Sequence, residues 1–259
     1  MEITADDIEE YKLWRKDEGV ADATVNREIA CLKRMFNLAI KWGQANVNPV
    51  NDVDFFREPP GRTRFLSIEE INRLLECANE NIRPVIFAAL NTGMRLGEIL
   101  TLKWSQVRLE GTIEPYVKVE GKTAKNNKDR WIPLNDAMCE LLSNLQDNGS
   151  DFVFLNRFGR PYSSVRTACG TACRRAGIED FHFHDLRHTF ASHFIMSGGD
   201  LLTLKEILGH SSMDMVQRYA HLAAAHKRKQ LNGLSNVLKI CHLSATNQVT
   251  KIRKEVLST

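Results

Sequence analysis

A segment with several prolines interrupts the helical periodicity of this chain and constrains its fold more than any other sequence feature. Residues 49–64 (PVNDVDFFREPPGRTR) show no repeating apolar spacing and contain three prolines and one glycine. Proline removes a backbone donor and clashes with the preceding helical turn, so such a cluster is typical of a connection between folded units. We therefore predict four parts: a helical domain over 1–58, a linker over 59–64, a second domain over 65–235 and a tail over 236–259.

The first 58 residues predict two amphipathic helices. Thr4 and Asp7 have the spacing of a capping box, and the helix that they open is expected to end near Gly19. In the second helix, apolar residues recur every three or four positions from Val25 to Ile40. Two helices of this length leave much apolar surface uncovered. We therefore expect them to dock on other elements, or a preceding helix to be missing through truncation at the N-terminus.

The second domain predicts helices around a small sheet. Ser67 and Glu70 have the spacing of a capping box, and a further helix is expected at about 82–91. Strand-like runs follow at 107–109, 116–119 and 130–132, the last two separated by the polar loop GKTAKNNKD. Later helices are expected to start at Asn135, at Ser163 or Ser164, and near His184, Asp200 and Ser212. This order predicts a mostly α, α+β fold with a minor antiparallel sheet.

The overall charge is nearly balanced, since 35 Lys and Arg oppose 32 Asp and Glu and give a formal net charge of +3. This balance alone does not indicate nucleic acid, although residues 222–259 carry seven basic side chains and one acidic side chain. The start of the chain is acidic, and no apolar run reaches the roughly 18 residues of a membrane helix. We therefore expect a cytoplasmic protein with no membrane partner. Six cysteines without a CxxC pair predict reduced structural thiols.

Three stretches hold more polar and charged side chains than packing requires: TGMRLGEIL at 92–100, HFHDLRHTFASH at 182–193 and LGHSSMDMVQRYAH at 208–221. In the first, Arg95 and Glu98 lie at i and i+3, and an ion pair on a helix surface is the ordinary explanation. In the second, the spacing places His184, Arg187 and His188 on one helical face, which predicts a cationic stripe that binds an anion.

The second and third stretches have competing explanations. A metal site in the second stretch would draw on four imidazoles: His182, His184, His188 and His193. A guanidinium at Arg187 would then lie beside the metal, which disfavours this hypothesis, and we predict no metal. In the third stretch His210 lies in a predicted turn, and Tyr219 alone has the helical spacing of an ordinary core aromatic.

Taken together, the three stretches and the loop Gly121-Lys122-Thr123 resemble the tyrosine recombinase, or phage-type integrase, family in order and spacing. The family motif has an Arg in a turn, a Lys in a β-hairpin, H-x-x-R, LGH and a Tyr nine residues later. The matching positions are Arg95, Lys122, His184, Arg187, His210 and Tyr219. The resemblance extends from about Ile3 to His221, but Met215 and Val216 stand where the family commonly has Thr.

The resemblance implies a helical, SAM-like core-binding domain, here partial, followed by a DNA breaking-rejoining catalytic domain. It also implies a site-specific recombinase that cleaves and rejoins DNA through a 3′-phosphotyrosine and needs no ATP, metal or other cofactor. Tyr219 would be the nucleophile, His184 the candidate general base and Lys122 the general acid.

The other implied roles concern charge and orientation. Arg95 and Arg187 would stabilise the negative charge of the transition state, because guanidiniums offer forked donors and stay protonated. His210 would donate a hydrogen bond to the scissile phosphate. Glu98 and Asp185 would orient these groups.

The implied partner is double-stranded DNA with inverted-repeat core sites. On DNA the chain would form a homo-tetramer in which the tail at 236–259 passes between protomers, and without DNA it would be a monomer or weak dimer. This partner would make the protein nucleoid-associated. By position, we expect phosphate contacts from seven basic residues: Arg62, Arg64, Lys125, Arg157, Arg160, Arg174 and Arg175.

Three alternatives stay open at the level of sequence. One is a catalytically silent DNA-binding fragment, in which a missing first helix or the altered helix around Tyr219 prevents assembly of the site. The second is the histidine-metal protein. The third is a type IB topoisomerase, which would share the chemistry but would relax supercoils without a paired site.

Overall fold

The computed structural model describes residues 3–58, 64–111, 114–121, 129–146 and 149–223. The chain divides into two compact units, Met1–Arg62 and Thr63–Thr259, and this division falls within the predicted linker at 59–64. Each unit has its own hydrophobic core. The two units are therefore described separately.

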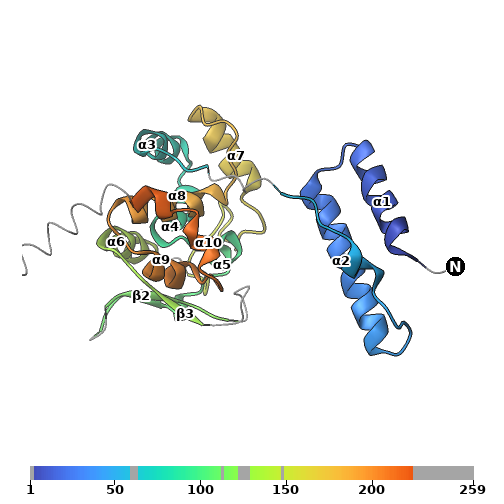
Figure 1. The fold of residues 1–259 in the computed structure, drawn as a ribbon. Coiled ribbons are helices and arrows are strands. Elements are labelled where there is room, and N and C mark those ends of the chain that lie inside the picture. The colour runs from blue at the N-terminus through green and yellow to red at the C-terminus, as the bar shows by residue number, and fades with distance from the viewer. Residues whose placement is uncertain (1–2, 59–63, 112–113, 122–128, 147–148, 224–259) are drawn as a thin grey trace, which may run out of the picture. The chain divides into compact units, whose positions relative to one another are not determined.

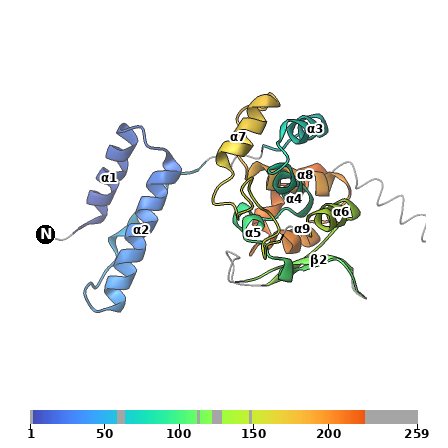
Figure 2. The ribbon, with the colours of Figure 1, turned by 180° about the vertical axis from the view of Figure 1, so that it is seen from behind.

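The first unit consists of two helices and a short 3-10 helix: α1 (Ala5–Asp17), α2 (Asp22–Lys41) and η1 (Pro49–Asp52). The predicted capping box at α1 is confirmed, because Thr4 Oγ1 accepts from the Asp7 N–H at 3.3 Å and the Asp7 carboxylate accepts from the Thr4 N–H at 2.8 Å. The two long helices lie side by side in both ribbon views (Figures 1 and 2).

The core of the first unit is small. Ile8 of α1 packs with Val25 and Ile29 of α2 and with Val50 of η1. Large apolar side chains around this core stay exposed, and Trp42 is 65% exposed. Uncovered apolar surface in this unit is what the sequence predicts for two such helices.

The second unit is mainly helical, in agreement with the predicted fold class. Its helices are α3 (Ile68–Cys77), α4 (Arg83–Thr92), α5 (Leu96–Leu100), α6 (Asp136–Leu145), α7 (Arg166–Arg175), α8 (Asp185–Met196), α9 (Leu201–Leu208) and α10 (Asp214–Gln217), with the 3-10 helices η2 (Trp104–Gln106) and η3 (Ala220–Ala223). Helices α4 and α8 pack against each other at the centre, where Ile86 and Leu186 are buried (Figures 1 and 2). In the described part of the chain, no helix has the length and apolar character needed to span a bilayer.

The predicted small antiparallel sheet is present. Its strands are β1 (Val107–Arg108), β2 (Tyr116–Val119) and β3 (Arg130–Pro133), in the order β1-β2-β3. In β2 and β3 every second side chain is buried, among them Val117 and Ile132. Val119 pairs with Arg130, so the loop between β2 and β3 leaves the sheet beyond this pair. Helix α9 packs against β3.

Most predicted helix starts agree with the structure, and two do not. Ser67, Asn135 and Asp200 cap their helices with side-chain hydrogen bonds. The helix expected from Ser163 or Ser164 begins at Arg166, and the Arg166 N–H donates to Ser164 Oγ at 3.2 Å. The helix expected near Ser212 begins at Asp214, after a turn in which the residue before the helix makes no side-chain cap. Serines favour turns as well as caps, so each helix begins two residues after a serine.

The described cysteines are free thiols. Cys169 and Cys173 are buried in α7, while Cys31 is exposed. The sixth, Cys241, lies outside the described residues.

Truncation of Leu142 tests the packing of the second unit. Leu142 of α6 is fully buried, so Leu142→Ala removes apolar contacts and leaves a cavity. We expect the free energy of unfolding of this unit to fall by about 2–5 kcal/mol. Leu202 of α9 is 57% exposed, and Leu202→Ala should change the same quantity by less than about 0.5 kcal/mol. Urea unfolding of the full chain, followed by circular dichroism, measures the free energy of unfolding of both variants. Equal decreases for Leu142→Ala and Leu202→Ala would contradict the burial of Leu142.

Candidate active site

A glycine turn between α4 and α5 places Arg95. Gly93 ends α4 in the left-handed conformation with a φ of +60°, and a Cβ there would lie 2.4 Å from Phe190 Cδ1. Both facts make glycine the residue that fits this turn. Arg95 then precedes α5, and its backbone N–H donates to the Glu98 carboxylate at 2.8 Å.

The Glu98 carboxylate joins two guanidiniums from different parts of the chain. Arg130 of β3 donates to both carboxylate oxygens, at 3.1 and 2.6 Å, and Arg95 Nη1 donates to Oε1 at 3.1 Å. Glu98 and Arg130 are both buried. Burial acts to raise the pKa of Glu98, but the hydrogen bond and charge of Arg130, with those of Arg95, hold it below its ordinary value. Glu98 is therefore an anion that fixes both guanidiniums.

Arg187 of α8 is buried and connects the ends of two helices. Its Nη1 donates to Gly93 O at 2.7 Å, and its Nη2 donates to Leu208 O at 2.7 Å. His210 Nε2 lies 2.9 Å from the same Nη2. Burial, together with the nearby charge of Arg95, lowers the pKa of Arg187 to about 9, so the guanidinium stays protonated at neutral pH.

A second glycine turn places His210. Gly209 ends α9 with a φ of +64°, and a Cβ there would lie 2.9 Å from Arg130 Cδ. Because a guanidinium only donates, His210 Nε2 accepts from Arg187 and the ring proton is assigned to Nδ1. Among the described residues, Nδ1 is buried without a hydrogen-bond partner. Burial, and then the charge of Arg187, lowers the pKa of His210 to about 3, so the ring is neutral and its Nδ1 donor is unused.

Tyr219 lies between α10 and η3 and is only 2% exposed. Its ring packs in an apolar cluster with Ala191 and Leu204, and its hydroxyl oxygen is 2.5 Å from His188 Nδ1. Burial raises the pKa of Tyr219, and the charges of Arg218 and Arg187 oppose this only in part. The phenol is therefore protonated at neutral pH.

The predicted face of α8 carries all three expected side chains. His184 packs edge-on against His188 with ring centroids 5.2 Å apart. Burial, followed by the charge of Arg187, lowers the pKa of His184. The hydroxyl of Tyr219 contacts His188 and not the predicted base His184. The role of His184 as base stays a prediction.

The predicted lysines, Lys122 and Lys125, lie outside the described residues, in the loop between β2 and β3. The loop leaves the sheet beyond Arg130, which contacts Glu98. At its base, the Gly121 N–H donates to Asp129 Oδ1 at 2.7 Å. Of the described residues that flank this loop, Asp129 directly precedes Arg130, the partner of Glu98.

Asp185 acts at the start of α8. Its carboxylate accepts from the His182 N–H at 2.9 Å, and its backbone oxygen accepts from Thr189 Oγ1 at 2.7 Å. Both contacts fix the first turn of the helix from which His184 and Arg187 project. The orienting role expected of Asp185 stays a prediction.

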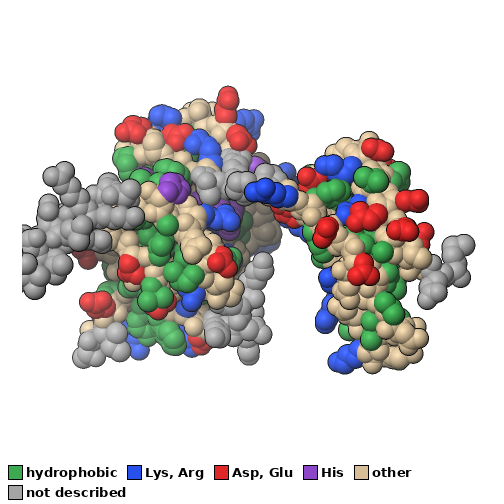
Figure 3. Space-filling model, in the orientation of Figure 1, with side chains coloured by type: hydrophobic (Ala, Val, Ile, Leu, Met, Phe, Trp, Pro, Cys, Tyr) green, Lys and Arg blue, Asp and Glu red, His purple; other side chains and the backbone are tan. Residues whose placement is uncertain are grey.

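The residues predicted to contact phosphates have different environments. Arg64 is half-buried and forms an ion pair with Glu70 at 2.7 Å. Arg62 lies outside the described residues. Figure 3 shows basic and acidic side chains intermingled on the viewed face of the second unit. Four predicted residues are exposed: Arg157, Arg160, Arg174 and Arg175.

Sequence reasoning missed Arg130, although a signal for it existed. Arg130 and Ile132 share the buried face of β3, and a charged residue at an inward position of a strand requires a buried partner. That partner is Glu98, which lies far away in the sequence.

Of the four imidazoles considered as metal ligands, His184 and His188 pack against each other, whereas His182 and His193 have separate environments. His193 Nε2 is 2.8 Å from Leu66 O, His188 Nδ1 contacts Tyr219, and the side chain of His182 is 76% exposed. Within the described ranges, no group of three or more His, Cys, Asp or Glu side chains is placed to hold a metal ion.

These groups define a class of site. Arg95 and Arg187 supply two fixed positive charges, His210 supplies an unused donor, and Tyr219 carries a phenolic hydroxyl. Fixed cations and donors suit the charge that develops on a phosphoryl group, and a phenol can form a covalent ester with it. The arrangement therefore suits phosphoryl transfer to a tyrosine.

Comparison with known proteins gives the family. Residues 64–226 match the phage integrase family. The chain is 36% identical over 233 residues to the integrase of Haemophilus phage HP1, a match that covers 85% of this chain and 63% of the relative. It is 30% identical over 240 residues to tyrosine recombinase XerC of Staphylococcus carnosus, with coverage of 86% and 79%. The chain belongs to the phage integrase family of tyrosine recombinases.

The fold agrees with this assignment. The Tn1549 transposon integrase, solved in complex with a circular intermediate DNA, superposes with a TM-score of 0.69 at 20% identity, covering 84% of this chain and 81% of that one. This chain spans about three fifths of the length of the phage HP1 and Salmonella phage P22 integrases.

Replacement of Glu98 tests the ion-pair network. Glu98→Gln leaves the Arg95 and Arg130 guanidiniums close together without a counterion. Because one member of a buried pair is removed, we expect the free energy of unfolding to fall by about 3–5 kcal/mol. Glu76→Gln, at an exposed glutamate of α3, is the control and should change it by less than about 0.5 kcal/mol. Urea unfolding at pH 7 measures both.

The ion-pair network of Glu98 also makes the stability of the chain depend on pH. The pKa of Glu98 is lower in the folded chain than the unfolded glutamate value of about 4.3. Its contribution to stability is therefore complete above that unfolded value and is lost as the pH falls through the lower folded pKa. Below about pH 4.3 the wild-type chain should lose stability more steeply than Glu98→Gln. Parallel profiles of unfolding free energy against pH for the two chains would contradict the assignment of Glu98 as a buried anion.

Proposed function

We propose that the chain is a site-specific DNA recombinase that cleaves and rejoins strands through a 3′-phosphotyrosine at Tyr219. The observation that carries this proposal is the convergence of Arg95, Arg187, His210 and Tyr219 from four separate segments of the chain. Each of the four matches a position of the family motif, and the contact of Arg187 with His210 and of Tyr219 with the neighbouring His188 supports a common role. Binding to DNA would place the protein at the nucleoid.

In the proposed reaction, a histidine on the same face of α8 as Arg187 accepts the proton of Tyr219, and the Tyr219 oxygen attacks the scissile phosphorus and displaces the 5′-oxygen of deoxyribose. Arg95 and Arg187 neutralise the charge that grows on the non-bridging oxygens, and His210 donates to one of them. Lys122 protonates the leaving oxygen. One P–O bond forms for each one broken, so the exchange is reversible and consumes no cofactor.

The proposed substrate is duplex DNA with inverted-repeat core sites. The exposed guanidiniums of Arg157, Arg160, Arg174 and Arg175 support phosphate contacts. Inverted repeats would match paired protomers, because the symmetry of a site mirrors that of the protein assembly.

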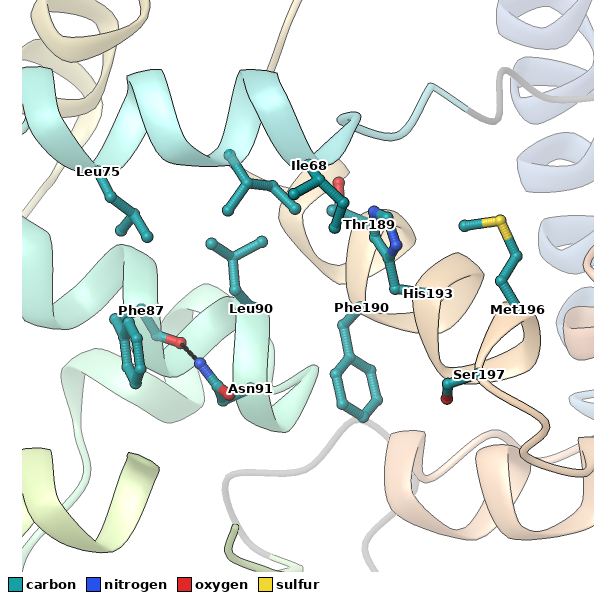
Figure 4. A pocket seen from close by; sticks show the side chains of 11 residues that line it. Ile68, Leu75, Phe87, Leu90, Asn91, Thr189, Phe190, His193, Met196 and Ser197 are labelled. Atoms are coloured by element: carbon teal, nitrogen blue, oxygen red, sulfur yellow. Dashed lines mark hydrogen bonds between the residues drawn. The ribbon is translucent and has the colours of Figure 1, made fainter. Parts of the chain in front are cut away.

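We further propose a homo-tetramer on DNA in which the tail at 236–259 of one protomer reaches its neighbour. An apolar groove of about 470 Å³ between α3, α4 and α8 supports an acceptor site for it. Figure 4 shows Ile68, Leu75 and Leu90 pointing into this groove. The tail supplies apolar residues for such a groove, among them Val237 and Ile240 in 236–243 (NVLKICHL).

Tyr219→Phe tests the chemistry. A nicked suicide substrate traps the covalent intermediate, because the cut strand loses a short fragment and cannot be rejoined. We expect the wild-type chain to form an SDS-resistant adduct and Tyr219→Phe to form none while binding the same DNA, since only the attacking oxygen is lost. The adduct should form equally well in excess EDTA, because side chains supply the charge.

The outcomes separate the alternatives. A gel shift without an adduct from the wild-type chain would favour the silent DNA-binding fragment. Loss of the adduct in EDTA, with recovery on adding zinc, would favour the histidine-metal protein. Relaxation of supercoiled DNA without a paired site would favour a topoisomerase.

Sedimentation of the DNA complex tests the tetramer. Ile68 is 55% exposed and lines the groove, so Ile68→Glu should reduce the fraction of tetramer on DNA at least tenfold while single-site binding persists. Leu202→Glu is the matched control, since Leu202 is equally exposed and lies outside the groove. A chain that ends at residue 235 should behave like Ile68→Glu. Tetramers from both altered chains would contradict the proposed exchange.

A further inference from the structure

The Tyr219 hydroxyl has a partner that the family motif does not assign. Its oxygen lies 2.5 Å from His188 Nδ1, whereas His184 packs against the His188 ring. We propose that His188 is the catalytic base that takes the proton of Tyr219. This inference rests on the proposed function, because it assigns a step in that reaction to a further residue.

The fold holds His188 in place from both sides. The preceding residue, Arg187, is anchored by Gly93 O and Leu208 O. The following residue, Thr189, is fully buried, and its Oγ1 donates to Asp185 O at 2.7 Å and accepts from the Leu66 N–H at 3.0 Å. His188 therefore projects from a turn of α8 that cannot shift without breaking these contacts. A base must be oriented in this way before the nucleophile reacts.

The protonation states fix the direction of the hydrogen bond. Burial, followed by the charges of His184 and Arg218, lowers the pKa of His188 to about 4, so its ring is neutral at neutral pH. Tyr219 keeps its proton, since burial raises the pKa of its phenol. The phenol is thus the donor and Nδ1 the acceptor, and the ring proton of His188 is assigned to Nε2.

In this step each bond that forms is matched by a bond that breaks. The O–H bond of Tyr219 breaks, its proton moves to the lone pair of His188 Nδ1, and the electron pair of that bond forms the new bond from Oη to phosphorus. The P–O5′ bond breaks, and its electron pair leaves with O5′, which takes a proton from Lys122. A phenolic oxygen loses its basicity as it bonds to phosphorus, so even a weakly basic imidazole accepts the proton at that stage.

Chemical rescue tests this assignment. With a nicked suicide substrate at saturating DNA, we expect His188→Ala to form the SDS-resistant adduct about 10²–10⁴-fold more slowly than wild type, with DNA affinity retained. Added imidazole should raise the rate of adduct formation by His188→Ala at least tenfold, because it fits the space vacated beside Tyr219. If His188 had only a structural role, added imidazole would leave this rate unchanged. His182→Ala, at an exposed histidine before the same helix, is the matched control and should stay within about twofold of wild type.

A second variant keeps the test decisive if His188→Ala fails to fold. His188→Gln retains a hydrogen-bond acceptor of similar reach but cannot take a proton, so it should fold, bind DNA and form adduct at least a hundredfold more slowly. A wild-type rate for His188→Gln, or rescue by imidazole at His184→Ala instead of His188→Ala, would overturn the assignment and leave the proposed function intact. Absence of any adduct from the wild-type chain would overturn both.

Discussion

The carboxylate of Glu98 is the interaction on which the site depends. It lies in a buried environment between the guanidiniums of Arg95 and Arg130, and each charge is tolerated there because the others compensate it. Arg130 also donates to Ile207 O at 3.0 Å and lies against Gly209. One anion therefore connects the sheet, the turn before α5 and the turn that carries His210. Loss of that charge would disturb three elements at once.

Local sequence signals were sufficient to predict most of the helices and strands. The caps at Thr4, Ser67, Asn135 and Asp200 depend on residues two or three positions apart, and all four form the expected side-chain bonds. The strands show the alternation of a half-buried sheet. Motif spacing named both Arg187 and His210, and the structure places these two side chains in contact. The two glycine turns, which are local sequence features, fix where Arg95 and His210 begin.

Contacts between distant segments explain what the sequence did not indicate. Arg130 and Glu98 are 32 residues apart, and no local pattern connects a strand residue with a helix residue at that distance. His184 and His188 lie on the same face of α8, so periodicity treats them alike. Which of the two histidines contacts Tyr219 depends on the position of α10, and this position is a property of the tertiary structure. The same applies to the start of α10, where serines favoured the wrong position.

The anchoring of Arg187 limits what this side chain can recognise. A guanidinium has five N–H donors, and the bonds to Gly93 O, Leu208 O and His210 engage three of them. Two donors remain, and under the proposed function they would be available to the oxygens of a single phosphate. A lysine has only three donors in all and would exhaust them on the same three partners. Arginine at this position thus fixes two helix ends and the His210 ring and still retains donors, which a lysine would not.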